Sequence, residues 1–192
     1  MNRIKYKRLY LGGFIVNKFK KILSALAVSI AFTTLASCGE NSFYKEWHDA
    51  GATIEEENVF KELTVDEVVT KRDNKDSFII FCGSSSKSGA ISAVSDIQVQ
   101  ADSLDYDGYV YFVNTKDILS SISGKKNATD KLGVQEIDSS DLVVVCYKEG
   151  KVYFDTSSSE KYGDIYSRFN IDGSLSYNAL ACYAFEYYPV EK

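Results

Sequence analysis

Two uninterrupted runs of apolar residues stand out along the chain, at positions 78–82 and 142–147. Neither run alternates apolar with polar residues, and short continuous runs of this kind are typical of strands buried on both faces of a sheet. Residues 148–150 (Lys-Glu-Gly) follow the second run and predict a tight turn, after which residues 151–154 return as an antiparallel edge strand. The pattern therefore predicts two central strands and a β-hairpin.

Apolar residues between these two runs recur at the spacing of a helix. The residues that share this spacing are Ala90, Val94, Ile97, Ala101 and Leu104. Their steps of four, three, four and three residues predict a helix of about four turns with one buried face. A second, shorter helix is expected to begin after residue 64, where a Thr at the N-cap and a Glu three residues later form a capping box.

Shorter segments complete the expected order of elements. These are strands at 60–63 and 109–113, a short helix at 117–122 before a polar stretch, and a closing helix within 175–188. Strands that alternate with helices and end in a hairpin and a helix predict a mixed α/β sheet. The segment 60–188 contains no repeat and no linker, so one domain is expected over residues 59–188, with a tail at 189–192.

The amino-terminal segment has the order of an export signal. Basic residues at 18–21 precede an apolar run at 22–36, which is too short for a comfortable transmembrane helix. The run ends in Leu35-Ala36-Ser37-Cys38, which closely resembles the lipobox of bacterial lipoproteins. That resemblance implies a diacylglyceryl thioether on Cys38 and cleavage just before it. The alternatives are an ordinary signal peptide with an incidental Cys38, and a retained membrane helix.

The lipobox resemblance implies a location outside the cytoplasm. Residues 1–37 would be the removed signal peptide, and acyl chains such as palmitate would hold the protein on the outer face of the cell membrane. Residues 38–58 are polar and acidic, and we expect them to form a lipidated tether. Trp47 and His48 lie within that tether, and the sequence leaves two positions open for them, docked on the domain or near the lipid headgroups.

Residues 1–15 lie unusually far ahead of the basic segment. Gly12 and Gly13 can be encoded by a ribosome-binding sequence, and Val16 can be encoded by a GTG start codon. One hypothesis is therefore that residues 1–15 are not translated, and the alternative is a long basic segment. The codon at Val16 decides between them.

Charge separates the chain into two unlike parts. Residues 1–37 carry seven Lys and Arg and no acid, which leaves 15 of the 22 basic residues and all 27 acidic residues in the remainder, a formal charge of −12. This acidic remainder of the chain repels phosphate backbones, and we therefore expect no nucleic acid partner. The single His excludes paired-His metal sites and weakens any hydrolytic triad, and we expect no metal or cofactor.

The predicted domain looks like the thioredoxin superfamily over roughly residues 59–188. The resemblance rests on the apolar strand 78–81, on a loop that runs straight into the long helix at Gly89, and on the strand 142–145 with its hairpin. The hairpin sequence Tyr147-Lys148-Glu149-Gly150-Lys151-Val152 is similar to the strand–Lys–x–Gly hairpin of the family. The expected fold class is therefore α/β, a thioredoxin-like mixed sheet with a C-terminal β-hairpin and a closing helix.

The chain departs from the family at its two catalytic hallmarks. A thioredoxin-like oxidoreductase carries Cys-x-x-Cys where the first long helix begins, because the helix N-terminus lowers the pKa of the attacking thiol. Here residues 84–90 read Ser-Ser-Ser-Lys-Ser-Gly-Ala, with no Cys. The family's cis-proline loop corresponds to residues 137–141, which contain no Pro, and the only Pro of the chain is Pro189. The resemblance therefore implies a domain without the usual thiol–disulfide exchange, and it assigns no catalytic residue.

The functional interpretation is a binding or accessory module rather than an enzyme. The resemblance implies a groove between two loops that could accept an extended segment of a protein or peptide partner. The candidate binding residues are Ser84, Ser85, Ser86, Lys87 and Ser88 of the first loop, with Ser139 and Ser140 of the second. The alternative is a divergent thiol–disulfide oxidoreductase that uses Cys82 alone or with a Cys from a partner. A solute-binding module is a third option, but the chain is short for two lobes.

The remaining candidate chemistry is weak. The family's antiparallel strand arrangement implies that Cys82 and Cys146 lie at opposite ends of the sheet, beyond disulfide reach. The loop at 83–89 lacks the Lys-Ser/Thr of a phosphate-binding loop, and residues 103–114 lack the key carboxylates of a calcium loop. Aromatic residues near the carboxyl end either present a binding face or close the core: Tyr166, Phe169, Tyr177, Tyr183, Phe185, Tyr187 and Tyr188.

Overall fold

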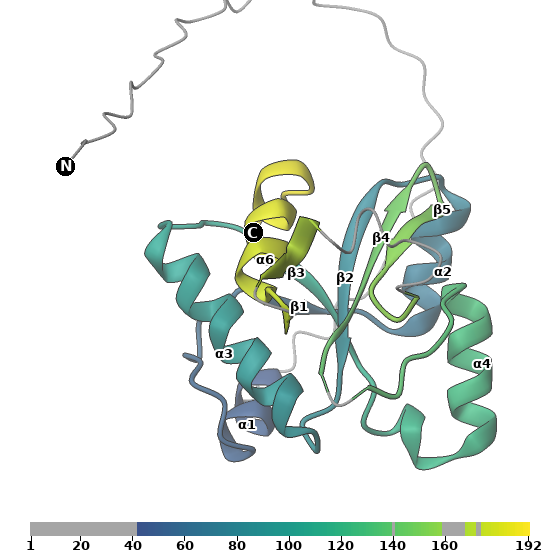
Figure 1. The fold of residues 1–192 in the computed structure, drawn as a ribbon, viewed down its shortest axis with the longest axis horizontal. Helices are drawn as coiled ribbons and strands as arrows, with labels where there is room; N and C mark the ends of the chain where they lie inside the picture. Colours follow the sequence, from purple (N-terminus) through teal and green to yellow (C-terminus); the bar gives the residue numbers. More distant parts are fainter. Residues whose placement is uncertain (1–41, 140, 159–167, 172–173) are drawn as a thin grey trace, which may run out of the picture. The chain divides into compact units, whose positions relative to one another are not determined.

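The computed structural model describes residues 42–192 apart from 140, 159–167 and 172–173 (Figure 1). All of these residues belong to one compact unit, Cys38–Lys192. The predicted signal peptide, the lipobox with Cys38, and Ser140 of the second candidate loop lie outside the described residues.

Five strands form one mixed sheet in the spatial order β1-β3-β2-β4-β5. The first three strands of this order are parallel to one another, and the last two are antiparallel to their neighbours. The strands are β1 (Phe60–Glu62), β2 (Phe78–Gly83), β3 (Val110–Asn114), β4 (Val143–Lys148) and β5 (Lys151–Asp155). This arrangement confirms the expected fold class, a thioredoxin-like mixed sheet with a C-terminal hairpin and a closing helix.

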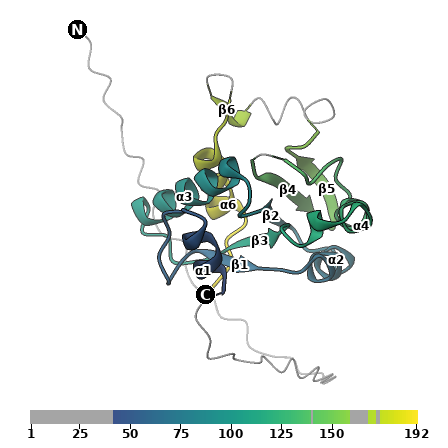
Figure 2. The same ribbon diagram turned by 90° about the horizontal axis from the view of Figure 1, so that it is seen from below.

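Helices cover both faces of the sheet. One layer consists of α1 (Ser42–Asp49), α3 (Ser88–Ser103) and α6 (Tyr177–Tyr187), and the other of α2 (Val65–Asp73) and α4 (Ile122–Leu132). Figure 2 shows the two layers on opposite sides of the strands. A 3-10 turn, η1 (Ile118–Ser120), precedes α4, and a small hairpin of β6 (Asn170–Ile171) and β7 (Ser174–Leu175) precedes α6.

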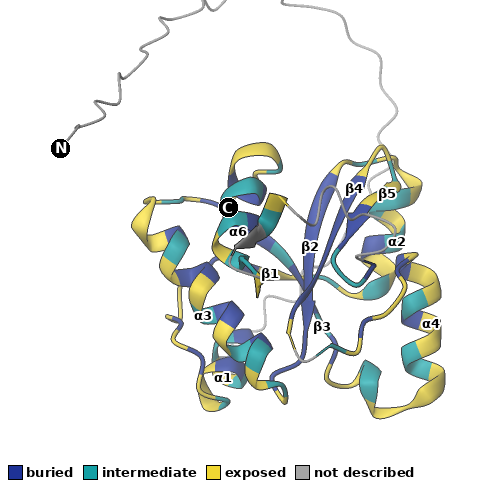
Figure 3. Ribbon diagram, in the orientation of Figure 1, coloured by how far each residue is buried: buried dark blue, intermediate teal, exposed yellow. Residues whose placement is uncertain are grey.

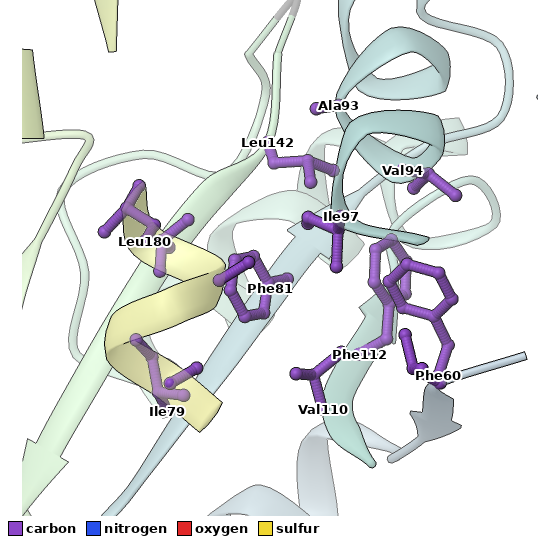
Figure 4. Packing of buried hydrophobic residues seen from close by; sticks show 14 of the residues in the cluster. Phe60, Ile79, Phe81, Ala93, Val94, Ile97, Val110, Phe112, Leu142 and Leu180 are labelled. Atoms are coloured by element: carbon purple, nitrogen blue, oxygen red, sulfur yellow. The ribbon is translucent and has the colours of Figure 1, made fainter. Parts of the chain in front are cut away.

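The sheet is buried on both faces, as the continuous apolar runs predict (Figure 3). Alternate residues of β2 enter different cores, with Phe81 in the core under α3 and α6 and Ile80 in the core under α2 and α4. Figure 4 shows Phe81 between Ile97 of α3 and Leu180 of α6. A central strand that serves two cores needs apolar residues at every position, which explains why β2 shows no alternation.

The N-terminus of α2 confirms the predicted capping box. The backbone N–H of Glu67 donates to Thr64 Oγ1 at 3.2 Å, and the backbone N–H of Thr64 donates to Glu67 Oε2 at 2.7 Å. Both bonds join residues three apart in the chain, so no distant segment is needed to form them.

Two details around the predicted helices are wrong. Leu104 was expected on the buried face of α3, but it follows the last helical residue and its side chain is 52% exposed. The polar stretch expected after residue 122 is itself helix α4, which ends at Gly133 in the left-handed conformation with φ 70°. Only Ala128 and Leu132 of α4 are buried, so its apolar periodicity is too sparse to be recognised in the sequence.

Residues 42–58 correct the expected tether. Phe43 and Trp47 of α1 are 3% and 0% exposed, and both rings pack on Phe112 of β3. Of the two positions left open for Trp47, the structure shows docking on the domain, while His48 is exposed beside the ring of Tyr44. The folded unit therefore begins well before residue 59, because one amphipathic helical turn supplies two large aromatic side chains to the core.

The expected tail at 189–192 is also tied to the fold. The backbone N–H of Tyr109 donates to the Val190 carbonyl at 2.8 Å, which forms an isolated antiparallel bridge beside β3. The Lys192 ammonium lies 3.3 Å from an Asp107 carboxylate oxygen.

Candidate functional site

The first candidate loop lies at the carboxyl end of β2, where α3 begins. Its serines bond to one another, with 2.7 Å between Ser84 Oγ and Ser86 Oγ and a bond from the Ser86 N–H to Ser84 Oγ at 3.3 Å. Ser84 and Ser85 are buried, whereas Ser86 and Ser88 are exposed and Lys87 is half-buried. The surface of this loop is therefore formed by Ser86, Lys87 and Ser88, and the other two serines belong to its interior.

A carboxylate from α1 holds this loop in place. Ser85 Oγ donates to Glu46 Oε1 at 2.5 Å, and Asn114 Nδ2 at the end of β3 donates to Glu46 Oε2 at 2.9 Å. The Lys116 ammonium lies 3.4 Å from Glu46 Oε1. One side chain thus connects α1 to the carboxyl ends of two neighbouring parallel strands.

Sequence reasoning missed Glu46 because it lies in the segment interpreted as a tether. The signal that could have found it is the aromatic pair Phe43 and Trp47, spaced four residues apart as on one face of a helix. A helix that buries that face brings the intervening Glu46 to the sheet edge.

A second carboxylate lies close to this cluster on β1. Partial burial raises the pKa of Glu62, the negative charge of Glu46 raises it further, and a hydrogen bond from Asn114 opposes both. Asn114 therefore interacts with both carboxylates. Because its pKa is raised, Glu62 binds a proton more readily than an ordinary Glu does.

Ion pairs join the two candidate loops. The Lys87 ammonium lies 3.2 Å from Asp138 Oδ1, and the Lys125 ammonium of α4 lies 3.2 Å from Asp138 Oδ2 and 3.1 Å from Glu136 Oε1. Hydrogen bonds from Lys125 and then Lys87 lower the pKa of Asp138. The structure therefore brings the first loop beside the segment that carries Ser139, as the predicted groove requires.

A polar cavity of about 570 Å³ lies beside the second loop. Its lining includes Ser139, the carboxylates of Glu136, Asp138 and Asp141, and Tyr177 at the start of α6. Ser139 is half-buried and its Oγ accepts a hydrogen bond from the Asp141 N–H at 3.2 Å. Because Glu136 and Asp138 are already paired with Lys125 and Lys87, this polar lining favours a ligand segment that forms hydrogen bonds.

The thiols offer little reactivity. Cys82 is 0% exposed in the core under α2 and α4, and this burial raises the pKa of its thiol far above the ordinary range. Cys146 lies in the core on the other face, and burial raises its pKa to about 11. Because Cys82 pairs with Val143 and Ile79 pairs with Cys146 across β2 and β4, the two thiols are offset along the strands. Cys82, Cys146 and Cys182 are all free, and no disulfide joins Cys82 to Cys146, as the family's strand arrangement implied.

Most of the carboxyl-terminal aromatic residues close the core. The rings of Phe169 and Tyr183 lie 5.4 Å apart, and each also packs on Phe154 of β5. Phe185 stacks on Tyr106 with 4.0 Å between ring centroids. Of the two alternatives, a binding face or closure of the core, the structure shows closure of the core for Phe169, Tyr183 and Phe185. Tyr166 lies outside the described residues.

No protein-family model matches this chain, and no curated protein matches it. Within the described part of the chain, no group of three or more His, Cys, Asp or Glu side chains is arranged to hold a metal ion. None of the helices described in the structure combines the length and apolar character needed to cross a membrane.

Proposed function

We propose that this protein is a membrane-anchored extracytoplasmic lipoprotein whose redox-inactive thioredoxin-like domain acts as a binding or accessory module. The observation that carries the proposal is the loop at the start of α3. In the place of a reactive Cys-x-x-Cys it holds serines, and one of them, Ser85, is buried and bonded to Glu46. A loop fixed in this way keeps the scaffold of the family without its nucleophile.

The two loops and the polar cavity supply the binding surface of this proposal. Lys87 and Asp138 hold the loops side by side, and the cavity beside Ser139 opens along the same end of the sheet. The partner would be an extended protein or peptide segment, and the polar lining of the cavity favours side chains that form hydrogen bonds.

The alternative of a single-cysteine oxidoreductase has little physical support. Only a thiolate attacks a disulfide, and a Cys82 thiol that is buried in an apolar core neither ionises readily nor meets a substrate. Cys82 is better explained as a small apolar residue of the core.

The proposal is tested in a bacterial host that processes lipoproteins. We expect the wild-type protein to partition into detergent and to gain the mass of a lipid on Cys38, while a Cys38→Ser variant stays in the aqueous phase. Insulin reduction should be absent, and thiol titration of the native protein should be the same for the wild type and for Cys82→Ala. A Cys82-dependent reductase activity would contradict the binding function, and an aqueous, unmodified wild type would contradict the anchor.

A further inference from the structure

We propose that the anchored domain contacts the bilayer through the tip formed by η1 and the start of α4, residues 118–126, where Ile122 inserts into the membrane interface. The inference rests on the proposed lipid anchor at Cys38. It adds a second, non-covalent contact between the domain and the membrane.

The first step is the short distance between the anchor and the folded domain. Because α1 begins at Ser42, only four Cα–Cα steps separate it from Cys38. An extended chain spans at most about 3.6 Å per residue, so Cys38 lies within about 14 Å of Ser42. A domain of about 150 residues is roughly 38 Å across, so this tether cannot let the far end of the domain turn to the bilayer.

The second step identifies the end of the domain that lies near the anchor. Glu46 lies one turn after Ser42 in α1, and its carboxylate contacts Ser85, Asn114 and Lys116. Figure 1 shows α1 and the beginnings of α3 and α4 at the same end of the domain, the lower end in that view, with α1 and α4 on opposite faces of the sheet. The lipid-proximal end is therefore the end that carries the η1–α4 tip, residues 118–126.

The third step is the chemistry of the η1–α4 tip. Ile122 is 90% exposed, more than any other exposed large apolar side chain in the described part of the chain. Ile118 and Leu119 beside it are only partly buried. Residues 118–126 contain two lysines and no acid, although Asp117 precedes them and Lys125 is paired with Glu136 and Asp138, so the tip is less acidic than the body of the protein.

The position of Lys126 fits the same orientation. It lies four residues after Ile122 on α4, hence on the same face and about 6 Å further along the helix axis. With Ile122 at the acyl boundary, the exposed ammonium of Lys126 would lie at the level of the phosphates. A single apolar side chain is sufficient here, because the lipid anchor makes its insertion intramolecular and so raises its effective concentration.

The experiment places a fluorescent indole at the tip. The chain has one Trp, the fully buried Trp47, so an Ile122→Trp substitution adds one exposed reporter to a constant background. The lipidated full mature chain is reconstituted on phosphatidylcholine vesicles that contain brominated phosphatidylcholine. We expect roughly twofold quenching of the added indole, because a residue at the interface lies within reach of the acyl chains.

The matched control is Leu104→Trp. Leu104 is also an exposed apolar residue, but it follows the far end of α3, which is 16 residues and about 24 Å long. Its indole should not be quenched.

Hydrogen exchange tests the same contact without a reporter at the tip. Backbone amides of residues 118–126 should exchange more slowly in the wild-type protein on vesicles than in the Cys38→Ser protein in solution.

Vesicle flotation separates failure of the docking from failure of the anchor. If the protein floats and only the indole at position 122 is quenched, docking is supported. If the protein floats and the two indoles are quenched equally or not at all, docking is overturned and the anchor stands. If the wild-type protein does not float, the anchor and the docking that depends on it are both overturned.

Discussion

Glu46 is the side chain with the most connections at the candidate site. It accepts hydrogen bonds from the buried Ser85 hydroxyl and from the Asn114 amide, and it pairs with Lys116. Buried donors without an acceptor are more costly than a lost surface contact, because they lose water as well as their partner. Glu46 therefore contributes to stability mainly by satisfying these donors, and its charge contributes less.

Substitution of Glu46 tests this role. Glu46→Ala should lower the free energy of unfolding by about 1–3 kcal/mol, because the Ser85 hydroxyl and the Asn114 amide lose their acceptor. Glu46→Gln keeps one acceptor oxygen and should lie between the wild type and Glu46→Ala. Chemical denaturation followed by circular dichroism measures the change.

The matched control for Glu46 is Asp49→Ala, an exposed acid in the same helix. Its effect should stay within about 0.5 kcal/mol, as is usual for surface substitutions. Equal losses for Glu46→Ala and Asp49→Ala would contradict the role assigned to the Glu46 carboxylate.

At the scale of elements, local and distant interactions differ in how far the sequence reveals them. The capping box of α2 and the apolar runs of β2 and β4 are visible in the sequence because each signal is complete within a few residues. Helices α1 and α4 are harder to recognise in the sequence. Only Phe43 and Trp47 of α1 and only Ala128 and Leu132 of α4 are buried, and both helices are stabilised by contacts with segments far along the chain. Tertiary contacts override weak local periodicity in both.

The link between α3, α4 and the second loop gives a prediction about pH. Asp138 is paired with Lys125 and Lys87, and its pKa is lowered, first by Lys125. A lowered carboxyl pKa contributes stability that is present above the ordinary Asp value near 3.8 and is lost as the pH falls through the folded-state pKa. Lys125→Gln should therefore raise the pKa of Asp138, and Lys87→Gln should raise it less.

Carboxyl carbon chemical shifts followed by NMR through an acid titration measure this order. Lys126→Gln is the control, because Lys126 is the exposed neighbour of Lys125 in α4. If neither Lys125→Gln nor Lys87→Gln moves the Asp138 titration, the ion pairs do not join the loops in solution. The groove would then lose its structural basis.

For the whole molecule, the main revision concerns where the domain begins. Phe43 and Trp47 pack on Phe60 and Phe112 of the parallel edge of the sheet, so the segment ahead of β1 belongs to the fold. The same segment leaves only a short connection to Cys38. The boundary therefore determines both the stability of the domain and the orientation that a lipid anchor would impose.

Truncation tests this boundary. Loss of a large buried aromatic side chain costs about 3–5 kcal/mol, and the stability of a whole domain is typically 5–15 kcal/mol. A chain of residues 59–192, which lacks Phe43 and Trp47, should therefore have no cooperative thermal unfolding transition or a strongly lowered midpoint. Circular dichroism on heating measures this.

The control for the truncation is a chain of residues 42–192, which retains α1 and should unfold cooperatively. If the 59–192 chain unfolds at the same temperature as the 42–192 chain, α1 is an appendage, and the short tether of the docking proposal has no basis. The two chains differ only in residues 42–58, so the comparison isolates that segment.

The sequence by itself determined the strands of the sheet, the long helix, the α2 cap and the absence of Cys-x-x-Cys, because each depends on neighbouring residues or on simple presence. It also carries the lipobox at Cys38, which stays a prediction. Only the tertiary structure decided that α1 belongs to the core, that Glu46 holds the Ser85 loop, and that Lys87 meets Asp138. These contacts join residues from 17 positions apart, for Phe43 and Phe60, to 69 positions apart, for Phe43 and Phe112. Their partners are set by how the chain packs around the sheet, which no local pattern encodes.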